Sequence, residues 1–145
     1  MSPEQLFSLC GMLATAGWLL LVFLPRQRWT ARLVCPVVIP LLIALLYLWL
    51  VATTFGRTQG GFGSLADVSR LFQNPWALLA GWIHYLAFDL FVGSWEVRDA
   101  QRVGVRHLFV VPCLALTFLF GPVGLLLYFA LRAGLRRRLT VGDQA

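Results

Sequence analysis

The sequence has no lysine, and its 145 residues contain only six acidic side chains, two histidines and three cysteines. Charged residues make up 12% of the chain and hydrophobic residues 59%, and the mean hydropathy is +0.78. So little charge excludes an ordinary soluble domain and is typical of an integral membrane protein. The cysteines, Cys10, Cys35 and Cys113, lie in or beside apolar segments without a Cys-x-x-Cys spacing, so we interpret them as small packing residues.

All twelve basic residues are arginine, and the formal net charge is +6. The arginines fall at the ends of apolar segments rather than in a basic domain interleaved with aromatic residues, so nucleic acid is not an expected partner. Arginine in such positions normally sets the direction of insertion and contacts lipid phosphate groups. We therefore expect membrane lipid as a partner.

Four apolar segments are long enough to cross a bilayer, whose core of about 30 Å needs about 20 helical residues. They span about 6–24, 33–55, 75–95 and 107–131, and a basic tail follows at 132–145. Because the connections are short, the sequence predicts an all-α integral membrane protein that forms one transmembrane domain over 1–145, a four-helix bundle.

The first segment is expected to be retained, because Glu4 rather than a basic residue precedes it and no Ala-x-Ala cleavage site follows it. No leader rich in arginine and serine precedes it, which favours a multi-pass protein of a bacterial inner (plasma) membrane. Between the second and third segments, a glycine-rich loop leads to Ser64 and Asp67, which have capping-box character, and Asn74-Pro75 ends the pattern. This predicts a short interfacial helix, either a plain connector or a lid.

Four spans place six arginines on each side of the membrane, so the count does not set the orientation. One side would carry Arg26, Arg28, Arg32, Arg98, Arg102 and Arg106, and the other Arg57, Arg70, Arg132, Arg136, Arg137 and Arg138. The balance becomes ten against two if the last segment is re-entrant and turns back at Gly121-Pro122. Its 25 residues nevertheless suit one kinked span, which is the interpretation we adopt.

Ionisable groups within the third span are costly at bilayer depth and therefore mark a candidate site. His84 and Asp89 are about 140° apart on a helix, so the two cannot bind one ion together. One face is rich in carboxylate and the other is aromatic; the first holds Tyr85, Asp89 and Glu96, and the second His84, Phe88, Phe91 and Trp95. This pattern fits a pocket for a long, flat, apolar molecule with a polar end. Alternatively, Asp89 accepts a hydrogen bond from a neighbouring helix and His84 caps a backbone carbonyl.

Further polar residues follow at one membrane face, namely Glu96, Asp99, Arg106 and His107. Arg98 or Arg102 could serve only to neutralise Glu96 and Asp99. A metal site from His84, Asp89, Asp99 and His107 is conceivable, but no His-x-x-x-His spacing supports it, and we expect no metal. In the fourth segment, small and polar residues recur on one stripe, which predicts a packing face: Cys113, Thr117, Gly121, Gly124 and Tyr128.

These motifs resemble the abscisic-acid-deficient-4-like family, whose plant members act as neoxanthin synthases. The resemblance rests on His84-Tyr-Leu-Ala-Phe-Asp-Leu-Phe-Val-Gly93, on Arg106-His107 and on the segment from Pro112 to Leu125. It implies a four-helix membrane protein and isomerisation of an epoxy-carotenoid to an allenic product. Such chemistry needs a base and an acid but no redox cofactor. The chain departs from the plant members in lacking a plastid leader.

From side-chain chemistry and the resemblance together, we assign Asp89 and His84 as catalytic residues within the pocket, with His107, Glu96 and Asp99 at its mouth. Substrate-binding residues are expected to be Tyr85, Phe88, Phe91, Trp95, Arg106 and Tyr128. The expected substrate is a carotenoid or another isoprenoid lipid, and no cofactor is expected. The alternative is a non-catalytic protein that binds pigment or lipid, or an assembly subunit of a membrane complex. A transporter is disfavoured by the absence of an inverted repeat, although a homo-oligomer would weaken that objection.

Overall fold

The computed structural model describes residues 1–54 and 56–136, and within these residues the chain is helical, with no strand. The predicted basic tail lies outside the described residues beyond position 136. The elements are α1 (Pro3–Phe23), the π-helix η1 (Thr30–Val38), α2 (Ile39–Thr54), α3 (Leu65–Leu71), α4 (Pro75–Val103), α5 (His107–Phe120) and α6 (Pro122–Arg136).

The helix boundaries follow from local capping chemistry. Ser2 and Gln5 form a capping box at the start of α1, and Asn74 caps α4 by accepting from the backbone N–H groups of Trp76 and Ala77. Both α1 and α4 have a proline in the first turn, where the missing backbone N–H costs no hydrogen bond. α4 ends at Gly104, whose φ of 76° is the left-handed conformation typical of a helix C-terminus. α4 therefore continues to residue 103, eight residues past the predicted end of the third span.

The second span begins with the π-helix η1, which the sequence did not reveal. In a π-helix the N–H of residue 36 would bond to the carbonyl of residue 31, but Pro36 has no N–H. The freed carbonyl of Ala31 accepts a hydrogen bond of 2.6 Å from Arg98 on α4 instead. The proline thus creates an acceptor for Arg98, and this arginine forms no ion pair with a carboxylate within the described residues.

Three helices are long and apolar enough to cross a membrane: α1, the continuous η1–α2 helix over Thr30–Thr54, and α4. α4 is central and packs against α1, η1, α2, α5 and α6. Close approach of α1 depends on glycine, because a Cβ at Gly93 would lie 2.6 Å from the Trp18 ring. The structure is that of a helical membrane protein with three candidate spans, rather than the four that we predicted.

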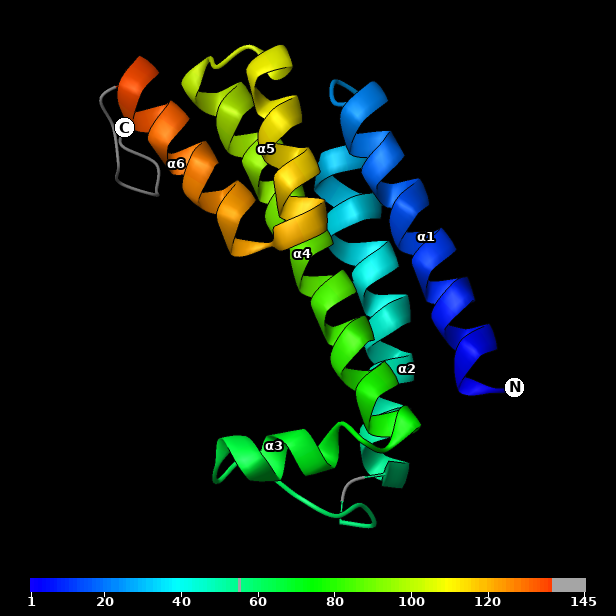
Figure 1. Cartoon of the computed structure of the whole chain (residues 1–145). Coiled ribbons are helices and arrows are strands. Elements are labelled where there is room, and N and C mark those ends of the chain that lie inside the picture. The colour runs from blue at the N-terminus through cyan, green and yellow to red at the C-terminus, as the bar shows by residue number, and fades with distance from the viewer. Residues whose placement is uncertain (55, 137–145) are drawn as a thin grey trace.

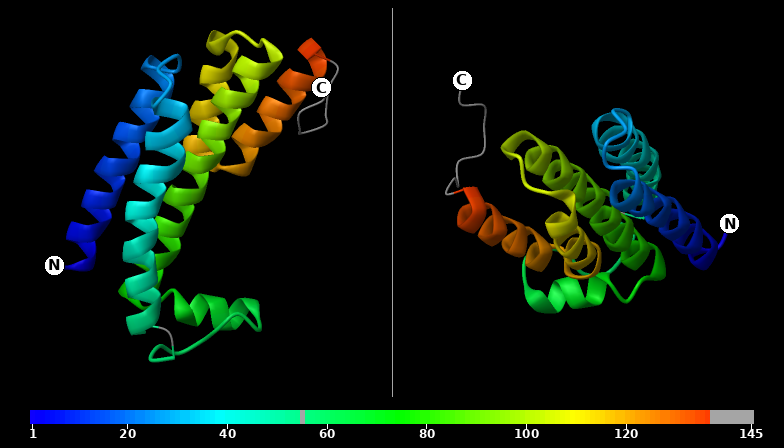
Figure 2. Two further views of the ribbon diagram at one scale, coloured as in Figure 1. Left: turned by 180° about the vertical axis from the view of Figure 1, so that it is seen from behind. Right: turned by 90° about the horizontal axis from the view of Figure 1, so that it is seen from above.

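The predicted fourth span is broken at Gly121. Its φ of 46° is a conformation that side-chain-bearing residues rarely adopt, so α5 stops there and α6 starts in a new direction. α6 packs against α5 and returns to the end of the molecule where α5 began (Figures 1 and 2). We refer to residues 107–136 as the hairpin. A side chain at Gly124 would collide with the α5 backbone at Thr117, so glycine permits the pairing.

The hairpin changes the distribution of arginine. Ten arginines lie within the described residues, because Arg137 and Arg138 fall outside them. Eight belong to the end of the molecule that carries the α1–η1 and α4–α5 connections, namely Arg26, Arg28, Arg32, Arg98, Arg102, Arg106, Arg132 and Arg136 (Figures 1 and 2). We call it the arginine-rich end. Arg57 and Arg70 belong to the opposite end, so the six-against-six count of the kinked-span interpretation does not hold.

The short helix predicted between the second and third spans is present as α3. Ser64 caps it by accepting from the backbone N–H of Asp67, and the hydroxyl of Ser64 donates to the Asp67 carboxylate. α3 lies across the end of α2 and α4 opposite the arginine-rich end (Figure 1). Its buried residue, Leu71, faces inward, whereas Leu65 is 87% exposed.

Candidate functional site

Three carboxylates of α4 face the hairpin. Asp89, Glu96 and Asp99 are seven and three residues apart, so about 100° per residue brings them to one side of the helix. Glu96 and Asp99 are buried, with 0% and 4% of their surface exposed. Each of the three meets a different part of the hairpin, so the hairpin and α4 together form the candidate site.

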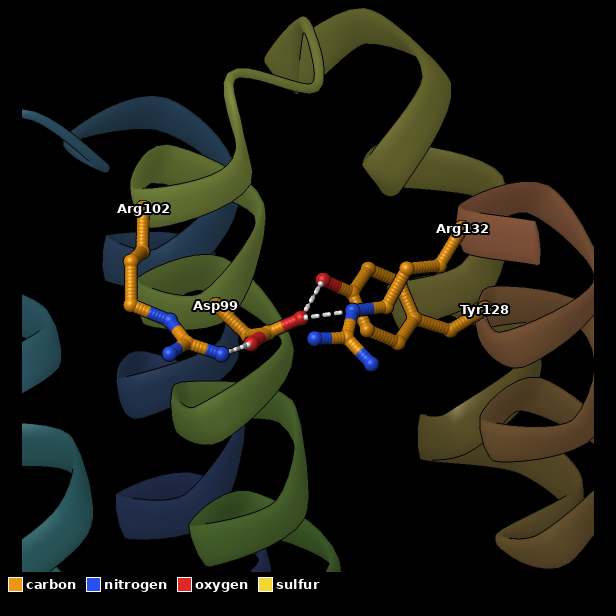
Figure 3. A network of polar contacts seen from close by, with 4 residues as sticks. All are labelled: Asp99, Arg102, Tyr128 and Arg132. Atoms are coloured by element: carbon orange, nitrogen blue, oxygen red, sulfur yellow. Dashed lines mark hydrogen bonds and ion pairs between the residues drawn. The ribbon is translucent and has the colours of Figure 1, made fainter. Parts of the chain in front are cut away.

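Asp99 is the centre of a buried polar network (Figure 3). Its Oδ2 accepts a hydrogen bond of 2.7 Å from the Tyr128 hydroxyl and lies 2.8 Å from Nε of Arg132, both on α6. Its Oδ1 accepts from Arg102, one turn further along α4, at 2.8 Å. Because Arg132 is only 1% exposed, this ion pair is shielded from solvent and anchors α6 to α4.

Glu96 lies against the middle of α5. Its Oε1 accepts a hydrogen bond of 2.9 Å from the hydroxyl of Thr117, and both side chains are fully buried. Its Oε2 is buried without a hydrogen-bond partner in the part of the chain that the structure describes. A buried carboxylate oxygen without a partner is costly, so Glu96 has the capacity to bind a further donor.

Asp89 lies at the turn of the hairpin. A Cβ at Gly121 would lie 3.1–3.5 Å from the carboxylate atoms of Asp89, so glycine allows the turn to approach this side chain. Tyr85, one turn before Asp89, donates a hydrogen bond of 2.8 Å to the carbonyl of Phe118 near the end of α5. The Oδ2 atom of Asp89 is buried and has no partner among the described residues.

A cleft of about 430 Å³ adjoins this end of the carboxylate row. It lies between α3, α4 and the end of α5, and its walls are Phe72, Leu78, Gly81, Trp82, Tyr85 and Leu119. Tyr85 belongs both to the cleft and to the surroundings of Asp89, because it lies one helical turn from the carboxylate. A molecule in the cleft therefore lies next to the Asp89 end of the site.

His84 lies elsewhere, on the side of α4 that faces α2 and α3. Its ring stacks on Phe88 at a centroid distance of 4.6 Å and contacts Tyr47 of α2 at 5.6 Å. It lines a separate cavity and forms no hydrogen bond with the described residues. The angular separation expected between His84 and Asp89 is thus present, and the structure does not bring the two side chains together.

The remaining predicted residues are dispersed. His107 Nε2 lies 3.0 Å from the carbonyl of Val22 and thereby gives one of the unpaired carbonyl groups at the C-terminus of α1 a hydrogen-bond partner. We had considered such capping of a backbone carbonyl for His84. Arg106 is the exposed N-cap residue of α5. Phe88 and Phe91 are exposed on α4, and Trp95 packs its ring on Tyr128 at 5.4 Å. Tyr128 therefore binds Asp99 and Trp95 in the described structure.

Two members of the site were assigned other roles from the sequence. Thr117 was expected only as part of a packing stripe, and Arg132 was placed on the side of the membrane away from Asp99. Small residues at three- and four-residue intervals did indicate the helix face to which Thr117 belongs. No feature of the sequence paired Arg132 with Asp99. The four residues of the conceivable metal site also do not converge, and the described residues contain no group of three or more metal-binding side chains.

Comparison with known proteins identifies a family. A family model described as ABA DEFICIENT 4-like matches residues 5–128. No curated protein and no solved structure matches the chain. The matched range includes Asp89, Glu96 and Asp99 of α4 together with Thr117 and Tyr128 of the hairpin, so most of the candidate site lies within it.

Proposed function

Because the chain belongs to the ABA DEFICIENT 4-like family, we propose that it is a membrane-embedded isomerase that acts on a carotenoid or another isoprenoid lipid. The observation that supports this proposal best is the pair of carboxyl groups on α4, Asp89 and Glu96. Each has a buried oxygen without a partner among the described residues, and the row ends beside a cleft between α3, α4 and α5.

The reaction that suits this arrangement is the opening of an epoxide conjugated to a polyene. The C–O bond of the epoxide breaks, a neighbouring polyene carbon loses a proton, and the oxygen gains one to become a hydroxyl group. The product has the same atoms as the substrate, so no oxidant or reductant is needed. The protein must supply one group that accepts a proton and one that donates a proton, and carboxyl groups can do both.

We assign Asp89 as the residue that contacts the substrate, because its neighbour Tyr85 lines the cleft. Glu96 lies two turns further along the same face, about 10 Å along the axis, which is beyond hydrogen-bond reach of an epoxide at Asp89. It is therefore assigned as a group that exchanges protons with Asp89 and not directly with the substrate. Thr117 holds one Glu96 oxygen and leaves the other for this exchange. Asp99 and His107 are already engaged by Arg132 and by the Val22 carbonyl, which supports structural roles for them.

The proposal is tested in membranes from a carotenoid-producing host, with and without the chain, by mass spectrometry and absorbance. We expect a product of unchanged mass with altered retention and absorbance. Asp89→Asn and Glu96→Gln keep the shape of the side chains but remove proton exchange, so each should lower turnover by about 100-fold or more. Asp67→Asn removes a carboxylate from α3, away from the site, and should leave turnover unchanged.

Folded Asp89→Asn and Glu96→Gln variants with normal turnover would falsify the assignment of these residues. An unchanged pigment that co-purifies equally with wild type and with both variants would contradict isomerisation and support non-catalytic binding. Unchanged pigments with nothing bound would contradict a carotenoid substrate and direct the search to other lipids.

A further inference from the structure

A second cavity lies beneath α3, on the opposite side of α4 from the carboxylate row. Its volume is about 280 Å³, and its walls come from α2, the connecting loop, α3 and α4. Most lining residues are apolar, including Leu71 of α3 and Phe72, which directly follows α3. The end of α3 therefore forms part of the cavity wall.

Four side chains with polar groups line this cavity: Tyr47, Thr54, Thr58 and His84. None of these four side chains makes a hydrogen bond to another described residue. By contrast, the hydroxyls of Tyr85 and Thr117 and the ring of His107 have hydrogen-bond partners. None of the four is fully buried, since His84 is exposed and the other three are half-buried, so their polar groups are accessible to a ligand that enters the cavity.

We propose that this cavity binds the hydroxyl-bearing end of a long polyene lipid, with His84 and Thr54 as hydrogen-bonding residues. An imidazole and a hydroxyl can each accept or donate a hydrogen bond, so both suit an alcohol. The inference rests on the proposed function for the identity of the molecule, and it makes the cavity the anchoring site for the lipid on which Asp89 acts.

The size of the cavity is consistent with a site for one end of a long lipid rather than for the whole molecule. At about 280 Å³ it lies just below the range of about 300–1,000 Å³ that holds a drug-sized ligand, so it suits one end of a long molecule. Phe72 and Gly81 line both this cavity and the cleft at Tyr85. The Phe72 ring packs on Gly81, where a Cβ would lie 3.0 Å from it, so this ring separates the two spaces and has to move before one molecule can occupy both. A lipid that passes Gly81 would extend from His84 on one side of α4 to Asp89 on the other.

The test measures binding separately from turnover. All-trans-retinol, a fluorescent polyene alcohol, is titrated into the purified full chain in detergent, and retinyl acetate serves as a probe of similar shape without the O–H donor. We expect wild type to bind retinol about 3- to 10-fold more tightly than the acetate, as one added hydrogen bond predicts. This comparison uses only wild-type protein and does not depend on the folding of a variant.

Two substitutions locate the site. His84→Phe keeps an aromatic ring against Phe88 but removes both ring nitrogens, and Thr54→Val removes a cavity hydroxyl; each should raise the retinol Kd about 3- to 10-fold. Thr53→Val is the matched control, because Thr53 is exposed on the same helix and bonds to the carbonyl of Trp49. Its Kd should equal that of wild type.

Equal affinity for retinol and the acetate, or an unchanged retinol Kd in both His84→Phe and Thr54→Val, would overturn the anchoring role. Specific retinol binding without any isomerised product would reject the enzyme and leave the binding site. Asp89-dependent turnover with an unchanged KM in His84→Phe would reject the anchor and leave the enzyme.

Discussion

Asp99→Asn is expected to weaken the attachment of the hairpin to α4 by about 3–5 kcal/mol. The substitution keeps the size of the side chain and removes its negative charge. Arg132, which is 1% exposed and lies 2.8 Å from Asp99, then loses the Asp99 carboxylate while it stays inside the structure. The cost arises mainly from the loss of this attraction between buried charges, because a buried ion is expensive to keep out of water.

The structure separates this charge effect from the loss of a single hydrogen bond. Tyr128→Phe removes only the bond of 2.7 Å between the Tyr128 hydroxyl and Asp99, so its expected cost is about 1.5–3 kcal/mol, as for a bond to a charged group. The order of stability should therefore be wild type, then Tyr128→Phe, then Asp99→Asn.

The free energy of unfolding of each variant is measured by denaturant titration in detergent micelles. Asp67→Asn is the matched control, since Asp67 also faces an arginine three residues away, at 3.9 Å, but in an exposed pair on α3. Its cost should not exceed about 1 kcal/mol. If Asp99→Asn costs no more than Asp67→Asn, the burial argument for the network is refuted.

The other predictions concern the hairpin. Gly124→Val should prevent α6 from packing on α5, because the new side chain meets the α5 backbone at Thr117. Size-exclusion chromatography should then show a loss of monodisperse protein. Gly134 has open space around it, so Gly134→Val should behave as wild type. Because arginine-rich ends stay in the cytoplasm, cysteines introduced at Gln27 and Gly134 should both react with a membrane-impermeant thiol reagent added on the cytoplasmic side. A cysteine introduced at Gln59 should react with the reagent added on the opposite side. Labelling of Gly134→Cys and Gln59→Cys from the same side would contradict the re-entrant hairpin.

Hydropathy was sufficient to predict the three long helices but not the path of the last segment. A window of 25 apolar residues has the same hydropathy whether the chain runs straight, kinks or turns back. Gly121-Pro122 signalled an interruption, and only the backbone conformation of Gly121 distinguishes a reversal from a kink. The even count of arginine was a second signal, since a reversal moves Arg132 and Arg136 to the other side.

The same limitation decided how much of the site could be predicted. The face shared by Tyr85, Asp89 and Glu96 follows from positions on one helix, so the sequence was enough to define it. The partners of Asp99 lie on α6, and a straight fourth span would have carried Arg132 to the far membrane surface. Their pairing depends on the direction of a neighbouring helix, which residue spacing within α4 cannot report.

Because the hairpin is short, α4 is covered to a different extent in the two leaflets of the bilayer. α5 has 14 residues and is about 21 Å long, so it turns back before it has crossed a core of about 30 Å. Beyond the turn, the flank of α4 that carries Tyr85 is left to the cleft and to α3. A lipid of the leaflet remote from the arginine-rich end can reach Tyr85, which lines the cleft, by lateral diffusion without entering water. In the nearer leaflet, α5 and α6 cover the same flank of α4.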